Sequence, residues 1–212
     1  MNKQNSKKVF LTIIALVGIF SLVTQLCLSI HNTLVPLAET IIRYFGFFTI
    51  EGNILVTVAV IFLLASSKSK WGRFFSDEAV LSAITVYIVI VGLVYNIVLR
   101  PLYVQHGMQA FVDNLLHVAV PILFLFYWIV FVPKAQLKWN ISRWLIYPTV
   151  YALVVMARGA FVNYYPYFFL NAGKFGYPRV LLNIAGLIVV FVVISLLLVA
   201  AGKLLSRTFT RH

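Results

Sequence analysis

The sequence predicts an all-α polytopic membrane protein, a bundle of six transmembrane helices with both termini in the cytoplasm. Of its 212 residues, 62% are apolar and only 10% are charged, whereas soluble domains average about 25% charged residues. Several apolar runs reach the ~20 residues that a helix needs to cross a bilayer. Basic residues gather in alternate connections between these runs. A single transmembrane domain over residues 1–212 therefore leaves no room for a soluble catalytic domain.

Each predicted span is a long apolar run. The first, residues 9–30, exceeds the ~7–15 residues of the apolar region in a signal peptide, so we expect it to be retained. The remaining runs are residues 43–65, 79–99, 113–132, 144–162 and 180–202. The connection 163–179 is rich in Tyr, Phe and Pro, and we expect either a lid over the outer side or an aromatic belt at the membrane interface.

The distribution of Lys and Arg predicts the orientation. The chain has 17 Lys and Arg residues against 5 Asp and Glu residues. Twelve of the basic residues fall on one side of the predicted bundle, three in each of four segments: Lys3, Lys7, Lys8; Lys68, Lys70, Arg73; Lys134, Lys138, Arg143; Lys203, Arg207, Arg211. Since cytoplasmic segments are rich in Lys and Arg, we expect cytoplasmic termini in a plasma-membrane protein. The anionic inner leaflet accounts for the positive charge, so we expect no nucleic-acid partner.

Polar side chains within the spans lie in the outer halves of five of them. At ~1.5 Å per residue they lie about 5–17 Å below the outer ends of the helices. Polar groups inside a membrane are costly and are commonly functional. The sequence therefore predicts one polar cavity that opens outward, with Asp113 at its rim. The residues within the spans are Thr49, Glu51, Asn53, Asn96, His117, Arg158 and Asn183.

His117 is the strongest candidate for a functional residue. Asp113, four residues earlier, shares its helix face. Pro121, four residues later, frees the carbonyl of His117 from its helical hydrogen bond and favours a kink. A titratable imidazole beside a carboxylate is typical of a general base. The alternative is a histidine that bonds between helices for packing.

Thr49 is a possible nucleophile, and Asn53 shares its helix face. From the residues alone, the better interpretation is that its hydroxyl bonds the carbonyl of Phe45 in its own helix. Glu51 and Arg158 are the most deeply placed charges, and each is a candidate partner for the other. Structural pairing and catalysis both remain open for these two.

Other residues carry weaker predictions. Tyr147 and Tyr151 share a face of the fifth span near its cytoplasmic end, which indicates packing. The four histidines and the one cysteine form none of the usual metal-binding motifs, and there is no glycine-rich phosphate loop. We therefore expect no metal and no cofactor.

Several motifs together resemble those of the bacterial predicted six-transmembrane proteins, which are related to the eukaryotic androgen-induced-gene and androgen-dependent TFPI-regulating proteins. The resemblance runs from about the second span to the sixth. The matching motifs are Y-F-G-F-F-T-I-E-G-N-I-L (Tyr44–Leu55), D-N-L-L-H-V-A-V-P (Asp113–Pro121), R-W-L-I-Y-P (Arg143–Pro148), R-G (Arg158–Gly159), Y-P-Y (Tyr165–Tyr167) and G-Y-P-R-V-L-L-N (Gly176–Asn183).

The resemblance implies an intramembrane hydrolase of fatty acid esters of hydroxy fatty acids, with Thr49 as nucleophile and His117 as base. In that mechanism Asp113 would orient the imidazole. A free carboxylate of the substrate would bind Arg158 or Lys174. The candidate donors to the oxyanion are Asn53, Asn114 and Arg158.

The alternative hypothesis is a non-enzymatic protein that binds lipid or a small solute in the same polar cavity. A transporter is less favoured, because the inner halves of the spans offer no polar path across the membrane.

Overall fold

The computed structural model describes residues 2–65 and 69–209, and all regular structure in these two ranges is helical. Lys68 and Arg211 lie outside them. The long elements are α1 (Lys3–His31), α3 (Phe48–Ala65), α5 (Glu78–Val94), α7 (Val120–Phe131), α8 (Ile146–Val162) and α10 (Tyr177–Phe209). The short ones are α2 (Leu37–Phe45), α4 (Lys70–Ser76), η1 (Tyr95–Leu99), α6 (Gly107–Asn114), η2 (Leu115–Ala119), η3 (Ser142–Leu145), η4 (Phe168–Leu170) and α9 (Ala172–Phe175).

Six helical stretches are long and apolar enough to cross a membrane, so the predicted all-α bundle of six spans is confirmed. They suggest a multi-pass membrane protein. Three of them include more than one element, because α5 continues into η1, α6 leads through η2 into α7, and η3 leads into α8. The stretches are Gln4–His31, Phe48–Ala65, Glu78–Leu99, Gly107–Phe131, Ser142–Val162 and Tyr177–Ser206.

The start of the second span differs from the prediction. A continuous run over residues 43–65 was expected, but α2 ends at Phe45 and α3 begins at Phe48. The hydroxyl of Tyr151 holds this break, because it donates to the carbonyl of Gly46 at 2.9 Å and accepts from the N–H of Phe48 at 3.2 Å. The break itself is made of Phe and Gly residues, Phe45–Phe48, so hydropathy alone does not reveal it.

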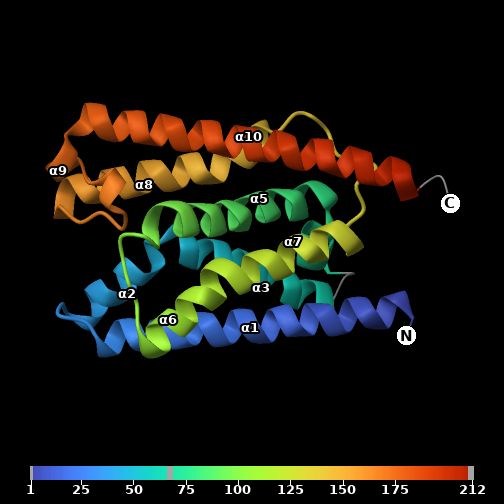
Figure 1. Cartoon of the computed structure of the whole chain (residues 1–212), viewed down its shortest axis with the longest axis horizontal. Coiled ribbons are helices and arrows are strands. Elements are labelled where there is room, and N and C mark those ends of the chain that lie inside the picture. Colours follow the sequence, from blue (N-terminus) through green and yellow to red (C-terminus); the bar gives the residue numbers. More distant parts are fainter. Residues whose placement is uncertain (1, 66–68, 210–212) are drawn as a thin grey trace.

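The helices lie side by side around α5 (Figure 1). The span that contains α5 has the largest buried share, and α5 packs against α3, α7 and α10. The spans that contain α8 and α10 are the least buried. A space between α3, α5, α8 and α10 is therefore close to the outside of the bundle, where lipid would surround it.

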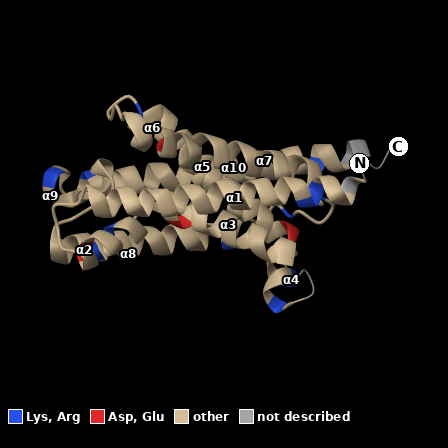
Figure 2. Cartoon of the chain, turned by 90° about the horizontal axis from the view of Figure 1, so that it is seen from below, with Lys and Arg blue, Asp and Glu red and all other residues tan. Residues whose placement is uncertain are grey.

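Both termini lie at one end of the bundle, and α2, α6 and α9 lie at the other (Figure 1). Lys and Arg gather at the two ends and leave the long middle almost free of them (Figure 2). This arrangement is typical of a chain whose middle crosses an apolar layer.

Candidate functional site

Thr49 lies in the first turn of α3, where a helix leaves its backbone N–H groups without helical partners. Here two tyrosine hydroxyls act as the missing acceptors. The N–H of Phe48 donates to Tyr151, and the N–H of Thr49 donates to Tyr167 at 3.2 Å. Thr49 is buried, with only 7% of the residue exposed. The start of α3 therefore presents a buried hydroxyl together with backbone donors and the positive end of the helix dipole.

His117 lies opposite Thr49, on the π-helical turn η2. Its Nε2 is 3.2 Å from the Oγ1 of Thr49. Its Nδ1 is 2.9 Å from the backbone carbonyl of Asp113. Because a carbonyl oxygen only accepts, Nδ1 carries the proton. In the neutral imidazole Nε2 is then an acceptor, and the hydroxyl of Thr49 donates to it.

Two asparagines satisfy the carbonyls that this π turn frees. Pro121 has no N–H to offer to the preceding turn. Asn53 on α3 donates to the carbonyl of Leu116, and Asn96 on η1 donates to that of His117, both at 3.2 Å. Both asparagines also bond their own helices. They fix the turn that carries His117, and so they position the histidine through its backbone.

Tyr95 holds the imidazole from its face. Its ring stacks on that of His117, with the centroids 3.7 Å apart and the planes 12° apart. The hydroxyl of Tyr95 donates to the carboxyl of Asp113 at 3.4 Å, and Gln109 donates to the other oxygen at 3.0 Å. The side chain of Asp113 therefore reaches His117 through Tyr95. Asp113 was expected to orient the imidazole; its backbone carbonyl contacts the ring, whereas its carboxyl group bonds Tyr95 and Gln109.

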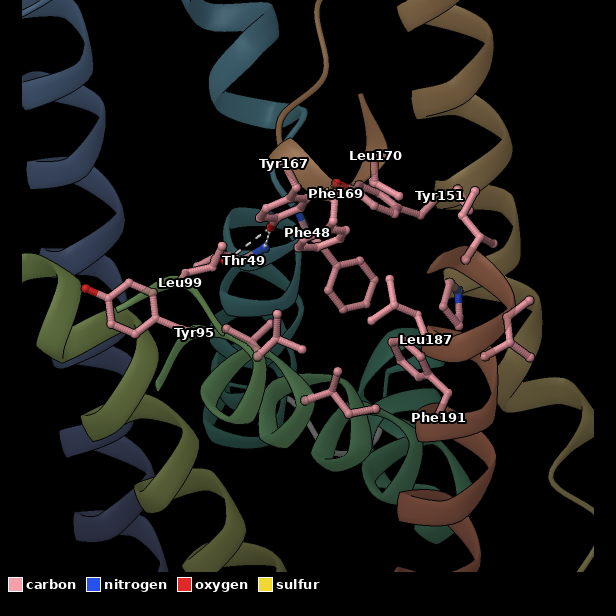
Figure 3. Close-up of a pocket in the computed structure, with 17 residues that line it drawn as sticks. Phe48, Thr49, Tyr95, Leu99, Tyr151, Tyr167, Phe169, Leu170, Leu187 and Phe191 are labelled. Atoms are coloured by element: carbon pink, nitrogen blue, oxygen red, sulfur yellow. Dashed lines mark hydrogen bonds between the residues drawn. The ribbon is translucent and has the colours of Figure 1, made fainter. Parts of the chain in front are cut away.

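The aromatic connection between α8 and α10 forms a lid over Thr49, as Tyr167 shows (Figure 3). The Tyr167 hydroxyl is 3.4 Å from Oγ1 of Thr49 and also accepts from the N–H of that residue. Tyr167 stacks on Phe169, with ring centroids 5.3 Å apart. Asn183 on α10 donates to the carbonyl of Phe169 at 2.7 Å, which ties the lid to the bundle.

The other end of the lid is held by charge. Glu39 on α2 accepts from Arg43 at 2.7 Å and from Arg158 on α8 at 2.7 and 2.9 Å. Both guanidinium groups lie over the ring of Tyr164, at 4.0 and 5.4 Å from its centroid. The hydrogen bonds from Arg43 and Arg158 hold the pKa of Glu39 below its usual range. This cluster, which we call the Glu39 latch, joins α2, α8 and the start of the lid.

Glu51 and Arg158, named above as candidate partners for each other, are not paired in the structure. Arg158 binds Glu39, which lies outside the apolar runs, and Glu51 accepts from the hydroxyl of Tyr147. Tyr147 and Tyr151 were expected near the cytoplasmic end, but they contact Glu51 and Phe48 in the first turn of α3.

The candidate donors to an oxyanion are also placed elsewhere. Asn53 uses its amide group on backbone carbonyls, and Arg158 is bound in the latch. Asn114 is exposed and bonds its own helix, at Ala110. The donors beside Oγ1 are instead the N–H of Thr49 and the hydroxyl of Tyr167. The sequence does not single out either donor. A backbone N–H is common to nearly every residue, and Tyr167 is one of 11 tyrosines.

Two cavities meet at Thr49, and both are also lined by Tyr95, Leu99 and Tyr167. The first, about 80 Å³, lies between α3, α5, α8 and α10. Its walls are almost wholly apolar, with Leu187 and Phe191 of α10 pointing into it (Figure 3). We call it the apolar cavity.

The second cavity, about 360 Å³, lies on the side of His117, and we call it the polar cavity. Its walls come from α1, the start of α3, the connection after η1, α6 and the lid. Gln109 donates to Gln25 at 2.9 Å on the wall of this cavity. Tyr103 lines it and is 51% exposed, so the cavity reaches the surface beside that residue.

No family model, curated protein or solved structure matches this chain. In the two described ranges, no group of three His, Cys, Asp or Glu side chains is arranged to bind a metal ion.

Replacing Glu39 with Gln should loosen the lid, because a neutral amide binds two guanidinium groups far more weakly than a carboxylate. We expect faster amide hydrogen exchange in residues 163–176 of the purified protein. Glu78→Gln removes a carboxylate at the start of α5, at the other end of the bundle, and should leave that exchange unchanged. Equal exchange in the wild type and Glu39→Gln would show that the latch does not hold the lid.

Proposed function

We propose that this chain is an intramembrane hydrolase of lipid esters, with Thr49 as nucleophile and His117 as general base. The observation that carries the proposal is the 3.2 Å contact between Oγ1 and Nε2. A hydroxyl becomes an effective nucleophile when an adjacent base takes its proton. The backbone carbonyl of Asp113 supports this role because it directs the acceptor nitrogen of the imidazole at the hydroxyl. The family resemblance implies the same pair.

In the first half of the reaction, Oγ1 of Thr49 attacks the ester carbonyl carbon while its proton passes to Nε2 of His117. A tetrahedral intermediate forms, and its negative oxygen lies beside the N–H of Thr49 and the hydroxyl of Tyr167. The bond from carbon to the alcohol oxygen then breaks. The imidazolium returns the proton to that oxygen, which leaves as a free alcohol and leaves an acyl group on Thr49.

In the second half, water attacks the acyl group and gives its proton to Nε2. The bond to Oγ1 breaks, Oγ1 recovers a proton from the imidazolium, and a fatty acid is released. The polar cavity supports this step, because it joins the surface to His117 and can supply the water.

A second candidate is a protein that binds lipid without turning it over. The two cavities that meet at Thr49 favour it, since together they offer an apolar and a polar half to an amphipathic molecule. This candidate needs the same lid and cavities but predicts saturable binding that is insensitive to Thr49.

We further propose that the chain resides in the plasma membrane with cytoplasmic termini and an outward-facing site. The distribution of Lys and Arg supports this orientation.

Hydrolysis of a fluorogenic octanoyl ester by the purified protein tests the proposed activity. Thr49→Ala and His117→Ala should each lower kcat/KM by about 10³-fold or more, since neither member of a nucleophile–base pair functions without the other. Thr57→Ala is the matched control, because Thr57 is also a buried threonine of α3 that bonds its own helix, and it should retain activity. Activity in a folded Thr49→Ala variant would contradict the assignment.

Tyr167→Phe tests the donor to the oxyanion. We expect kcat to fall by about 10²-fold with little change in KM, because loss of one such donor acts on the transition state. Tyr165→Phe removes a hydroxyl from the same lid, where the Tyr165 ring packs against Gly159 on α8. This variant should leave kcat unchanged. A Tyr167→Phe variant with normal kcat would limit that hydroxyl to a structural role.

Reporter fusions test the orientation in bacterial cells. Green fluorescent protein fused to either terminus should fluoresce, and alkaline phosphatase at the same positions should be inactive, because the first folds in the cytoplasm and the second outside it. An active phosphatase at either terminus would contradict the proposed topology.

A further inference from the structure

The position of Thr49 between two unlike cavities constrains the two arms of an ester. When the carbonyl carbon is beside Oγ1, one arm enters the apolar cavity and the other enters the polar cavity. The acyl chain belongs in the apolar cavity. That cavity holds only the start of a chain, but Ile188 on its wall is 37% exposed. The rest of the chain can therefore continue between α8 and α10 into the lipid.

The leaving group then occupies the polar cavity, whose polar lining consists mainly of amides and hydroxyls. A chain of hydrogen bonds runs along its wall. Gln25 donates to Ser29 at 3.4 Å and accepts from Gln109 at 2.9 Å, and Gln109 also donates to Asp113. Amides and hydroxyls offer both donors and acceptors, which matches the hydroxyl groups of a polyol.

Lys and Arg are absent from the lining of the polar cavity in the described part of the chain, where Asp113 is the one acidic residue. Three arginines on neighbouring elements bond residues outside this lining. Arg43 and Arg158 both bind Glu39, and the exposed Arg100 donates to Asn96 at 3.0 Å. A carboxylate in the cavity would lose its hydration beside Asp113 without a cation in return, which is unfavourable. The expected anchoring of a free carboxylate by Arg158 or Lys174 finds no support in this lining.

We propose that the preferred leaving group is a neutral polyol, as in a monoacylglycerol or an acylated sugar, rather than a hydroxy fatty acid. This inference rests on the proposed hydrolase function. The volume of the polar cavity, about 360 Å³, lies within the ~300–1,000 Å³ usual for small-molecule sites. The exposed mouth at Tyr103 lets the released alcohol leave toward water.

The test compares two esters with the same acyl chain: 1-oleoylglycerol and the oleoyl ester of 12-hydroxystearic acid. With purified wild-type protein we expect kcat/KM to be about tenfold or more higher for the glycerol ester, the scale of discrimination by polar contacts and charge. Equal or faster hydrolysis of the anionic ester, still abolished by Thr49→Ala, would overturn the inference and leave the hydrolase standing. No hydrolysis of either ester or of the octanoyl ester would contradict both the polyol inference and the proposed hydrolase function.

A gain-of-charge variant gives a second, independent measurement. Gln105 is exposed and lines the polar cavity, so Gln105→Arg places a cation there without disturbing the core. We expect this variant to shift the ratio of the two kcat/KM values about tenfold toward the anionic ester. Gln136→Arg makes the same change on an exposed residue after α7, outside both cavities, and should leave the ratio unchanged. An unchanged ratio in Gln105→Arg would also count against the inference.

Discussion

The site is built around backbone N–H and C=O groups that need hydrogen-bond partners, because an apolar bundle cannot leave such groups unpaired. The N–H groups of Phe48 and Thr49 at the start of α3 donate to the hydroxyls of Tyr151 and Tyr167. The carbonyls before Pro121 are satisfied by Asn53 and Asn96. The same hydrogen bonds that satisfy the backbone therefore hold the threonine and the histidine in register, and fold and site depend on each other.

The broad architecture and the outline of the site follow from the sequence for simple reasons. Apolar runs and basic connections predict six spans because a bilayer imposes length and charge rules on any helix. His117 is conspicuous because an imidazole within an apolar run has to be satisfied by the protein. Pro121 predicts a freed carbonyl, and the structure places the amide of Asn96 on it.

The remaining features depend on how the chain folds back, which periodicity does not encode. The break between α2 and α3 lies in an apolar segment and exists because Tyr151, about 100 residues later, bonds both sides of it. The pairing of Arg158 with Glu39 joins a span to a connecting helix, so a search for partners within the spans misses it. Tyr167 becomes part of the site only through the path of the lid.

Whether Thr49 is an activated nucleophile can be measured by identifying the residue that a fluorophosphonate modifies. The purified protein is treated with the reagent, digested and analysed by mass spectrometry. We expect a phosphonyl adduct on Oγ1 of Thr49, formed at a rate that falls sharply in His117→Ala, because His117 accepts the proton of that hydroxyl. An adduct on another residue, or no adduct on a folded protein that accepts the reagent in its cavities, would rule out Thr49 as the nucleophile.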